Sequence, residues 1–396
     1  MPGTTLRRRW PEQSGFDNLA IAGDWTRTPI NAACVEAAAM SGLLAARFIT
    51  GIDTPIAGAR DFPITQGPDQ PPAAPGLPAM VEQIGITAGP GPLNLSGCRS
   101  LFLLAAAAEP QLRAWCQSMF VNPSNGALDI RPIVPAVLLQ WCQIARVDSL
   151  NPDFGPRLGW FPENDVGFWI PVGLGREIDG WFVVSEIGLA PALLLVDHPT
   201  GLVSGREVWG YPKQWGSFVN PKGPTDPGPF VAQAYAVTEK GGPSQMSDLF
   251  TVTRVGSDAP EAVGKVDDAL KALHELLLGA AGEKLLPGIK LADELVDMAF
   301  GASPRQFFLK ETRSGDAPFE ACYQAVTASS GRFSYKSMSF MPGPFELRVL
   351  PRYSHPICQV LGMNPVSTAD FAVWVEFDTS LDNAVVIAGA GAEETP

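Results

Sequence analysis

Residues 205–214 read Gly-Arg-Glu-Val-Trp-Gly-Tyr-Pro-Lys-Gln, and the lysine of this run is Lys213. The preceding proline fixes the approach of the chain to the lysine, and Trp209, Tyr211 and Trp215 supply aromatic bulk that could exclude water. A desolvated ammonium loses its proton more readily, and a neutral amine can attack a carbonyl carbon to form a Schiff base. The pattern therefore predicts a nucleophilic lysine. The ordinary alternative is a surface lysine that follows a turn.

The pattern Gly-Arg-Glu-x-x-x-Tyr-Pro-Lys resembles the signature of the acetoacetate decarboxylase family. In that family the lysine after Tyr-Pro forms the Schiff base, so the resemblance implies the same role for Lys213. In acetoacetate decarboxylase the lysine is activated by apolar burial or by a cationic neighbour. The resemblance covers about residues 92–385. It implies an α+β fold, in which a closed β-barrel is surrounded by helices.

Two carboxylates and one arginine upstream are candidates for the rest of the site. Residues 164–172, Asn-Asp-Val-Gly-Phe-Trp-Ile-Pro-Val, are similar to a family strand with an acidic residue five positions before Ile-Pro-Val. Asp165 occupies that place. The family residue is a glutamate, one methylene longer, so Glu163 is a second candidate for proton transfer or substrate orientation. Arg99 falls near the family's active-site arginine and would hold an anionic group, the alternative being an ordinary solvated arginine.

The sequence departs from the family pattern at two places. Decarboxylating members carry a second lysine directly after the Schiff-base lysine, where this chain has Gln214, and a further carboxylate is missing near Cys142-Gln143. Without the neighbouring cation, burial must account for a larger share of the decrease in the pKa of the lysine. The departures favour a larger β-keto acid, or aldol and dehydration chemistry, over acetoacetate. A non-catalytic module that binds a small molecule is the alternative.

The N-terminal segment, about residues 10–51, carries a separate resemblance. An apolar strand is expected at residues 18–24 and an Ala-rich helix from Asn31, and together they resemble the C-terminal, flavin-binding end of the FAD-dependent amine oxidase and phytoene desaturase family. There Gly23 and Asp24 would approach the cofactor. The glycine-rich turn that grips ADP is absent, so the resemblance implies a vestigial site. FAD would bind only if a partner completed it, as in a split or fused oxidoreductase.

The chain is expected to have three parts: the flavoprotein-like fragment at residues 1–53, a linker at 54–91, and the decarboxylase-like domain at 92–396. The linker is rich in proline, which opposes regular structure. Within the last part, short β-rich runs between Gly and Pro turn signals predict antiparallel strands. They lie at residues 168–172, 181–187, 192–196, 346–350 and 371–377. One amphipathic helix is predicted at about residues 259–278.

Composition narrows the function classes. Hydrophobic residues make up 46% of the chain and charged residues 17%, which is typical of a globular protein with a large core. The net charge of −13 disfavours nucleic acid, and no apolar run is long enough to span a membrane. Six cysteines without a C-x-x-C pair favour a reducing, cytoplasmic compartment, and the spacing of the three histidines predicts no metal site. We expect a small keto-acid substrate, no organic cofactor, and a chain that could form a homo-oligomer.

Overall fold

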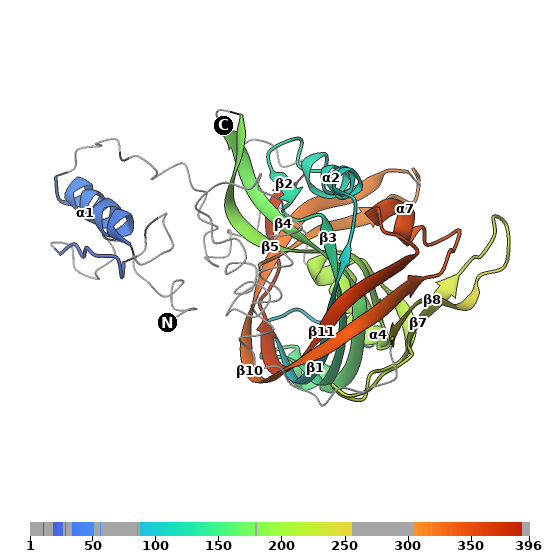
Figure 1. Cartoon of the computed structure of the whole chain (residues 1–396). Coiled ribbons are helices and arrows are strands. Elements are labelled where there is room, and N and C mark those ends of the chain that lie inside the picture. Colours follow the sequence, from blue (N-terminus) through green and yellow to red (C-terminus); the bar gives the residue numbers. More distant parts are fainter. Residues whose placement is uncertain are drawn as a thin grey trace. The chain divides into compact units, whose positions relative to one another are not determined.

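The computed structural model describes residues 11, 19–26, 28, 34–50, 56, 85, 88–178, 180–255, 305–317 and 319–389. The chain divides into two compact units, Met1–Val81 and Glu82–Pro396 (Figure 1). The division falls inside the stretch 54–91 that the sequence predicts as a linker.

The first unit contains one described helix, α1 (Val35–Thr50), which confirms the predicted Ala-rich helix. Glu36 in its first turn and Arg47 in its last complement the helix dipole. The strand predicted beside it is wrong, because residues 19–22 are described and form no strand. A strand needs a ladder of backbone hydrogen bonds to a neighbouring strand. Ile21 N instead donates a hydrogen bond to Pro11 O (2.9 Å), which belongs to no strand.

The second unit consists mainly of strands. They are β1 (Leu93–Ala106), β2 (Asp129–Pro132), β3 (Ala136–Ser149), β4 (Trp160–Ile178), β5 (Trp181–Val196), β6 (Lys213–Val219), β7 (Phe230–Ala236), β8 (Gln245–Arg254), β9 (Arg305–Arg313), β10 (Ala321–Val349), β11 (Val366–Leu381) and β12 (Val385–Gly389). The described helices of this unit are short: α2 (Glu109–Cys116), α3 (Gly155–Leu158), α4 (Pro199–Ser204) and α7 (Ile357–Leu361), with π-helical turns η2 (Gln117–Val121) and η3 (Gly205–Trp209). The described part is therefore richer in strand than the expected α+β class. The helix predicted at 259–278 lies outside the described residues.

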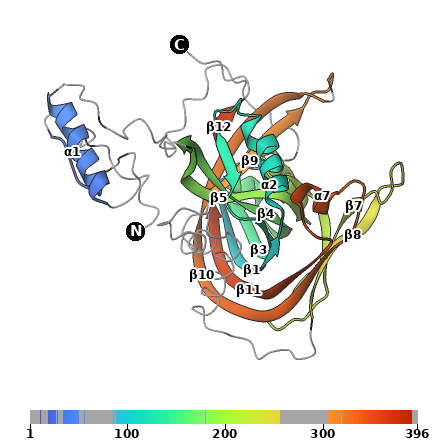
Figure 2. The same cartoon turned by 45° about the horizontal axis from the view of Figure 1, so that its top comes forward.

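Seven strands pair into a closed ring in the order β4, β3, β1, β11, β10, β9, β5, because β5 pairs with both β9 and β4. The long curved strands β10 and β11 run side by side in both views (Figures 1 and 2). The strand pairings thus close the sheet into a ring. A regular β-barrel, which the resemblance to the acetoacetate decarboxylase family implies, stays a prediction.

The predicted strands coincide with observed ones, apart from Leu350, which follows the end of β10, and two of them merge. Residues 181–187 and 192–196 both belong to β5, although Gly188 and Pro191 stand between them. Pro191 pairs with Trp169 where the register between β4 and β5 shifts. Proline is tolerated in a strand at such an irregularity, because no ladder hydrogen bond is lost there.

Strand β3 shows how the ring separates a packed core from a cavity. Its odd positions, Val137, Leu139 and Trp141, belong to the largest hydrophobic cluster. Successive side chains of a strand point to opposite faces, and the even positions, including Gln140 and Cys142, line a cavity instead. The two-residue period therefore assigns one face to the core and the other to the site.

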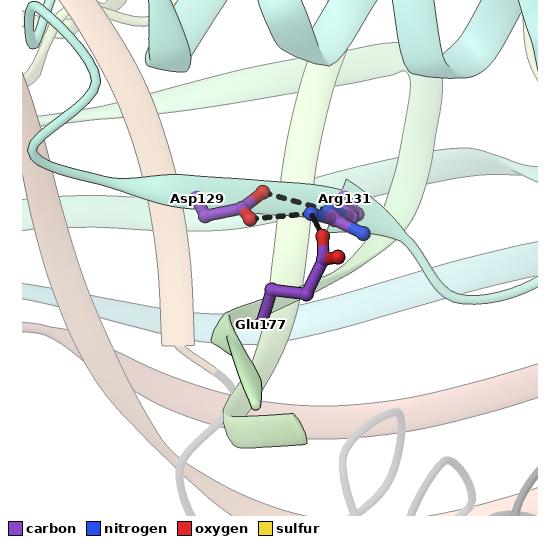
Figure 3. A network of polar contacts seen from close by, with 3 residues as sticks. All are labelled: Asp129, Arg131 and Glu177. Carbon is purple, nitrogen blue, oxygen red and sulfur yellow. Dashed lines mark hydrogen bonds and ion pairs between the residues drawn. The ribbon is translucent and has the colours of Figure 1, made fainter. Parts of the chain in front are cut away.

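A charged group on the sheet ties β2 to the end of β4. Arg131 donates to Asp129 from Nε (2.8 Å) and Nη2 (2.7 Å), and its Nη2 also bonds Glu177 (3.2 Å), as Figure 3 shows. Its guanidinium also lies 4.2 Å from the centre of the Phe182 ring.

In the parts of the chain that the structure describes, no helix combines the length and the apolar character needed to cross a bilayer.

Candidate active site

Lys213 is the first residue of β6, and it pairs with Leu194 of β5 in parallel register. The π-helical turn η3 ends at Gly210, whose φ of +97° is a left-handed conformation that suits glycine. A Cβ at Gly210 would also lie 2.8 Å from Cα of Lys310. This glycine of the motif therefore lets the chain turn sharply against β9 and enter β6 at the lysine.

Two other residues of the motif hold the lysine in place. A Cβ at Gly205 would lie 2.5 Å from Cδ of Lys213, so glycine leaves room for the lysine stem. Arg206 donates from Nη1 to the backbone oxygen of Lys213 (2.9 Å). The arginine of the motif thus acts on the backbone of the nucleophile.

Both predicted carboxylates meet the lysine. Lys213 Nζ lies 3.0 Å from Oε1 of Glu163 and 3.8 Å from Oδ2 of Asp165. The three side chains are 8%, 4% and 18% exposed, respectively. Glu163 approaches so closely because α4 presents Gly201, where a Cβ would lie 2.0 Å from Oε1 of Glu163. Strand β4 supplies both carboxylates, and Glu163 is the nearer partner.

The carboxylates determine the charge of the lysine. Burial lowers the pKa of Lys213, but the charges of Glu163 and Asp165 and the hydrogen bond that Lys213 donates to Glu163 outweigh it, so its pKa is raised. The expectation that burial alone leaves a neutral amine is therefore wrong for the free site. That expectation failed because it counted desolvation without the two nearby negative charges.

The pKa of Asp165 is raised as well, but for Asp165 the cause is burial. Burial, followed by the charges of Glu163 and Asp197, raises the pKa of Asp165 to about 7, although Lys213 lowers it. Its Oδ1 is buried and has no hydrogen-bond partner in the protein. A carboxyl that titrates near neutral pH can accept and return a proton, as general acid–base catalysis requires.

The aromatic environment is partly as predicted. Trp209 and Tyr211 are buried, and the Tyr211 ring centre lies 5.4 Å from Nζ of Lys213. Tyr211 also donates its hydroxyl to Oε1 of Gln306. Trp215 is exposed and lines neither cavity at the site, so its predicted part in shielding the lysine is wrong.

The structure does not bring Arg99 to the site. Its neighbours in β1, Cys98 and Ser100, are buried, whereas Arg99 is exposed and absent from the described lining of both cavities. Strand alternation explains this result, since Arg99 must point away from the face that Cys98 occupies. The predicted anion-binding role of Arg99 is not supported.

Gly23 and Asp24 belong to the first unit. Gly23 has a φ of +138°, and its backbone N–H donates to Oγ of Ser41 (3.0 Å). The amide expected to face a flavin is thus already bonded within the protein. Among the described residues, no group of three or more His, Cys, Asp or Glu side chains is placed to hold a metal.

No family model and no curated protein matches the chain. Among solved structures, acetoacetate decarboxylase from Legionella pneumophila is similar at 13% identity, with 78% of this chain and 92% of that chain covered and a TM-score of 0.49. An acetoacetate decarboxylase-like enzyme from Sphingomonas wittichii matches at 12% identity (76% and 94% covered, TM-score 0.46). The enduracididine biosynthesis enzyme MppR complexed with pyruvate matches at 11% identity (76% and 92%, TM-score 0.44). The flavoprotein resemblance of residues 10–51 gains no support from these comparisons.

Proposed function

We propose that this chain is a Schiff-base-forming carbon–carbon lyase with chemistry of the acetoacetate decarboxylase type and with Lys213 as its nucleophile. The observation that carries the proposal is the buried group of one amine and two carboxylates beside a cavity. Buried charges without a structural reason cost stability and are concentrated at functional sites. The sequence motif and the geometry point to the same lysine.

Imine formation begins with loss of a proton from the Lys213 ammonium. Asp165 Oδ2 lies 3.8 Å from Nζ and is placed to accept it, and a substrate that displaces water from the site disfavours the charged pair relative to the neutral one. The neutral Nζ then attacks the carbonyl carbon. The resulting carbinolamine takes back a proton on its oxygen and loses one water, which leaves a protonated imine on Lys213.

The protonated imine draws electrons from the neighbouring carbon. In a β-keto acid, the bond to the carboxylate breaks, carbon dioxide leaves, and the electron pair becomes an enamine. Asp165 can protonate the enamine carbon, and water then hydrolyses the imine to release the ketone and restore Lys213. The same enamine can instead add to an aldehyde, and the aldol product can lose water. Each of these steps uses groups of the chain itself and needs no added cofactor.

Borohydride trapping tests the proposal. The protein is incubated with keto acids, ketones and aldehydes, reduced with sodium borohydride, and digested for mass spectrometry. We expect an adduct on Lys213 and none in Lys213→Met. Lys336→Met is the matched control, because Lys336 is an exposed lysine paired with Asp378 at 2.6 Å. Absence of any adduct across the panel would favour a non-catalytic module that binds small molecules.

A further inference from the structure

Two neighbouring cavities meet at the site. The first is lined by Lys213 and Glu163. The second is lined from all seven strands of the closed ring and does not include the lysine. Their lining residues have four members in common: Leu95, Asp165, Tyr211 and Leu381. When the carbonyl carbon of a substrate lies at Lys213, the rest of the molecule can therefore extend past Asp165 and Tyr211 into the second cavity.

The wall of the second cavity is mostly apolar and aromatic. Phe102, Ile144, Trp169, Phe333 and Phe377 line it. Burial of apolar substrate surface against such side chains is favourable, because it removes that surface from water. This wall suits a ring or a branched alkyl group better than it suits water or a charged group.

The charges of the two cavities disfavour an anionic substrate. Lys213 is the only cationic side chain among the described residues that line either cavity, and Glu163 and Asp165 already neutralise it. A substrate carboxylate would lose its hydration and meet two carboxylates without a cation of its own. An unpaired buried charge is strongly unfavourable.

One donor in the second cavity lacks a partner. Trp169 is 5% exposed, and its buried Nε1 makes no hydrogen bond within the protein. Buried N–H groups are nearly always satisfied, so an unpaired donor in a cavity wall calls for an acceptor on a ligand. An uncharged ether, hydroxyl or carbonyl oxygen fits this wall, because it accepts the bond without bringing a charge.

Resting on the proposed function, we infer that Lys213 acts on an uncharged aldehyde or ketone. Its apolar substituent, about the size of an aromatic ring, lies in the second cavity, and an oxygen of this substituent accepts a hydrogen bond from Nε1 of Trp169. Such a substrate has no carboxylate to lose. The protonated imine on Lys213 instead loses an α-proton to Asp165 and becomes an enamine, which adds to an aldehyde, and the aldol product can then lose water. In the reverse direction the hydroxyl of the aldol gives its proton to Asp165, the carbon–carbon bond breaks, an aldehyde leaves, and the electron pair becomes the enamine.

Competition among carbonyl compounds tests the inference. We measure the second-order rate of borohydride trapping on Lys213 for acetone, acetoacetate, 4-phenylbutan-2-one and 4-(4-methoxyphenyl)butan-2-one. We expect both aryl ketones to react at least 10-fold faster than acetone, and acetoacetate to react no faster than acetone. The methoxy compound should exceed the phenyl compound by about 5-fold. In Trp169→Phe that last advantage should disappear, while the advantage of the phenyl ring over acetone remains.

A cavity-filling variant gives the matched control. Ile144→Phe narrows the second cavity, so it should slow the aryl ketones by about 10-fold more than it slows acetone. Equal rates for all ketones, or a preference for acetoacetate, would overturn the inference while leaving the proposed function standing.

A binding measurement keeps the two ideas separable. If no compound is trapped, the proposed function fails, and calorimetry with 4-(4-methoxyphenyl)butan-2-one then decides whether the second cavity takes this class of ligand. Binding that Ile144→Phe weakens would support the assignment of the cavity. Absence of binding would remove it.

Discussion

The second unit contains two groups that each join one cation to two carboxylates, and they behave differently. Arg131, Asp129 and Glu177, drawn in Figure 3, form a partly exposed group. Their side chains are 25%, 31% and 60% exposed, respectively. Lys213, Glu163 and Asp165 are much more buried. The two groups therefore have the same composition, one cation and two carboxylates, but water reaches the first group and is largely excluded from the second.

The causes of the pKa shifts show what burial changes. Hydrogen bonding to the Asp129 carboxylate is the largest influence on Arg131, and it raises a pKa that was already high. For Lys213 the largest influence is burial, which opposes the carboxylates, and for Asp165 burial moves the pKa to about 7. The exposed group can only join strands together. The buried group holds a proton that can move near neutral pH.

Removal of the buried cation should have the largest effect. Lys213→Met should abolish imine trapping and lower turnover at least 1000-fold, because no other lysine lines the described cavities. The measurement is trapping and turnover with a ketone that reacts with the parent protein. Lys336→Met, which breaks an exposed ion pair, should keep both. Trapping that survives in Lys213→Met would place the nucleophile elsewhere.

Loss of the nearer carboxylate should have the next largest effect. Glu163→Gln should lower the free energy of unfolding by about 3 kcal/mol, because it breaks a buried ion pair while Asp165 still balances part of the lysine charge. The same change removes the main influence that raises the pKa of Lys213, so imine formation should begin at lower pH. Urea unfolding and a pH profile of trapping measure the two effects. An unchanged pH profile would contradict the assigned cause of the pKa shift.

The pH dependence of stability should follow Asp165. The pKa of Asp165 is raised from 3.8 to about 7 in the folded protein, so protonation of this carboxyl stabilises the fold. The stabilisation is complete below pH 3.8 and is lost as the pH rises through 7. One pKa unit corresponds to 1.36 kcal/mol, so the loss is at most about 4 kcal/mol. Asp165→Asn should flatten the decline between pH 4 and pH 8, as measured by urea midpoints. Asp129→Asn, in the exposed group, should leave the decline unchanged.

The sequence predicts the buried group better than its charge state. The lysine motif and the spacing before Ile-Pro-Val identify Lys213, Asp165 and Glu163, because all three lie in strands or turns with strong local signals. The direction of the pKa shift of Lys213 could not be predicted from the sequence. It depends on the distances of 3.0 and 3.8 Å from Nζ to the two carboxylates, which lie on a strand far from Lys213 in sequence. Arg99 was misplaced for a simpler reason: its side of β1 depends on register, and a shift by one residue exchanges the two faces.

The fold shows the same division between local and long-range information. The five β-rich runs predicted from the sequence fall in β4, β5, β10 and β11, so local patterns identify four of the twelve described strands. The closure of the ring through β5 and β9 could not be predicted, because it joins two parallel segments more than 100 residues apart. The second cavity was missed for that reason as well. Phe102, Trp169 and Phe333 look like ordinary core residues until the ring brings their strands together.

The smallest effect should come from the exposed group. Glu177→Gln should change the free energy of unfolding by at most about 0.5 kcal/mol, because Glu177 is 60% exposed and Asp129 still holds Arg131 through two hydrogen bonds. Urea midpoints at low and high salt measure the effect, which should shrink further as salt screens the charges. The same substitution at Glu163 should cost several times more and depend little on salt. Equal costs at the two positions would mean that burial does not separate the two groups, and the argument that assigns chemistry to the inner one would lose its basis.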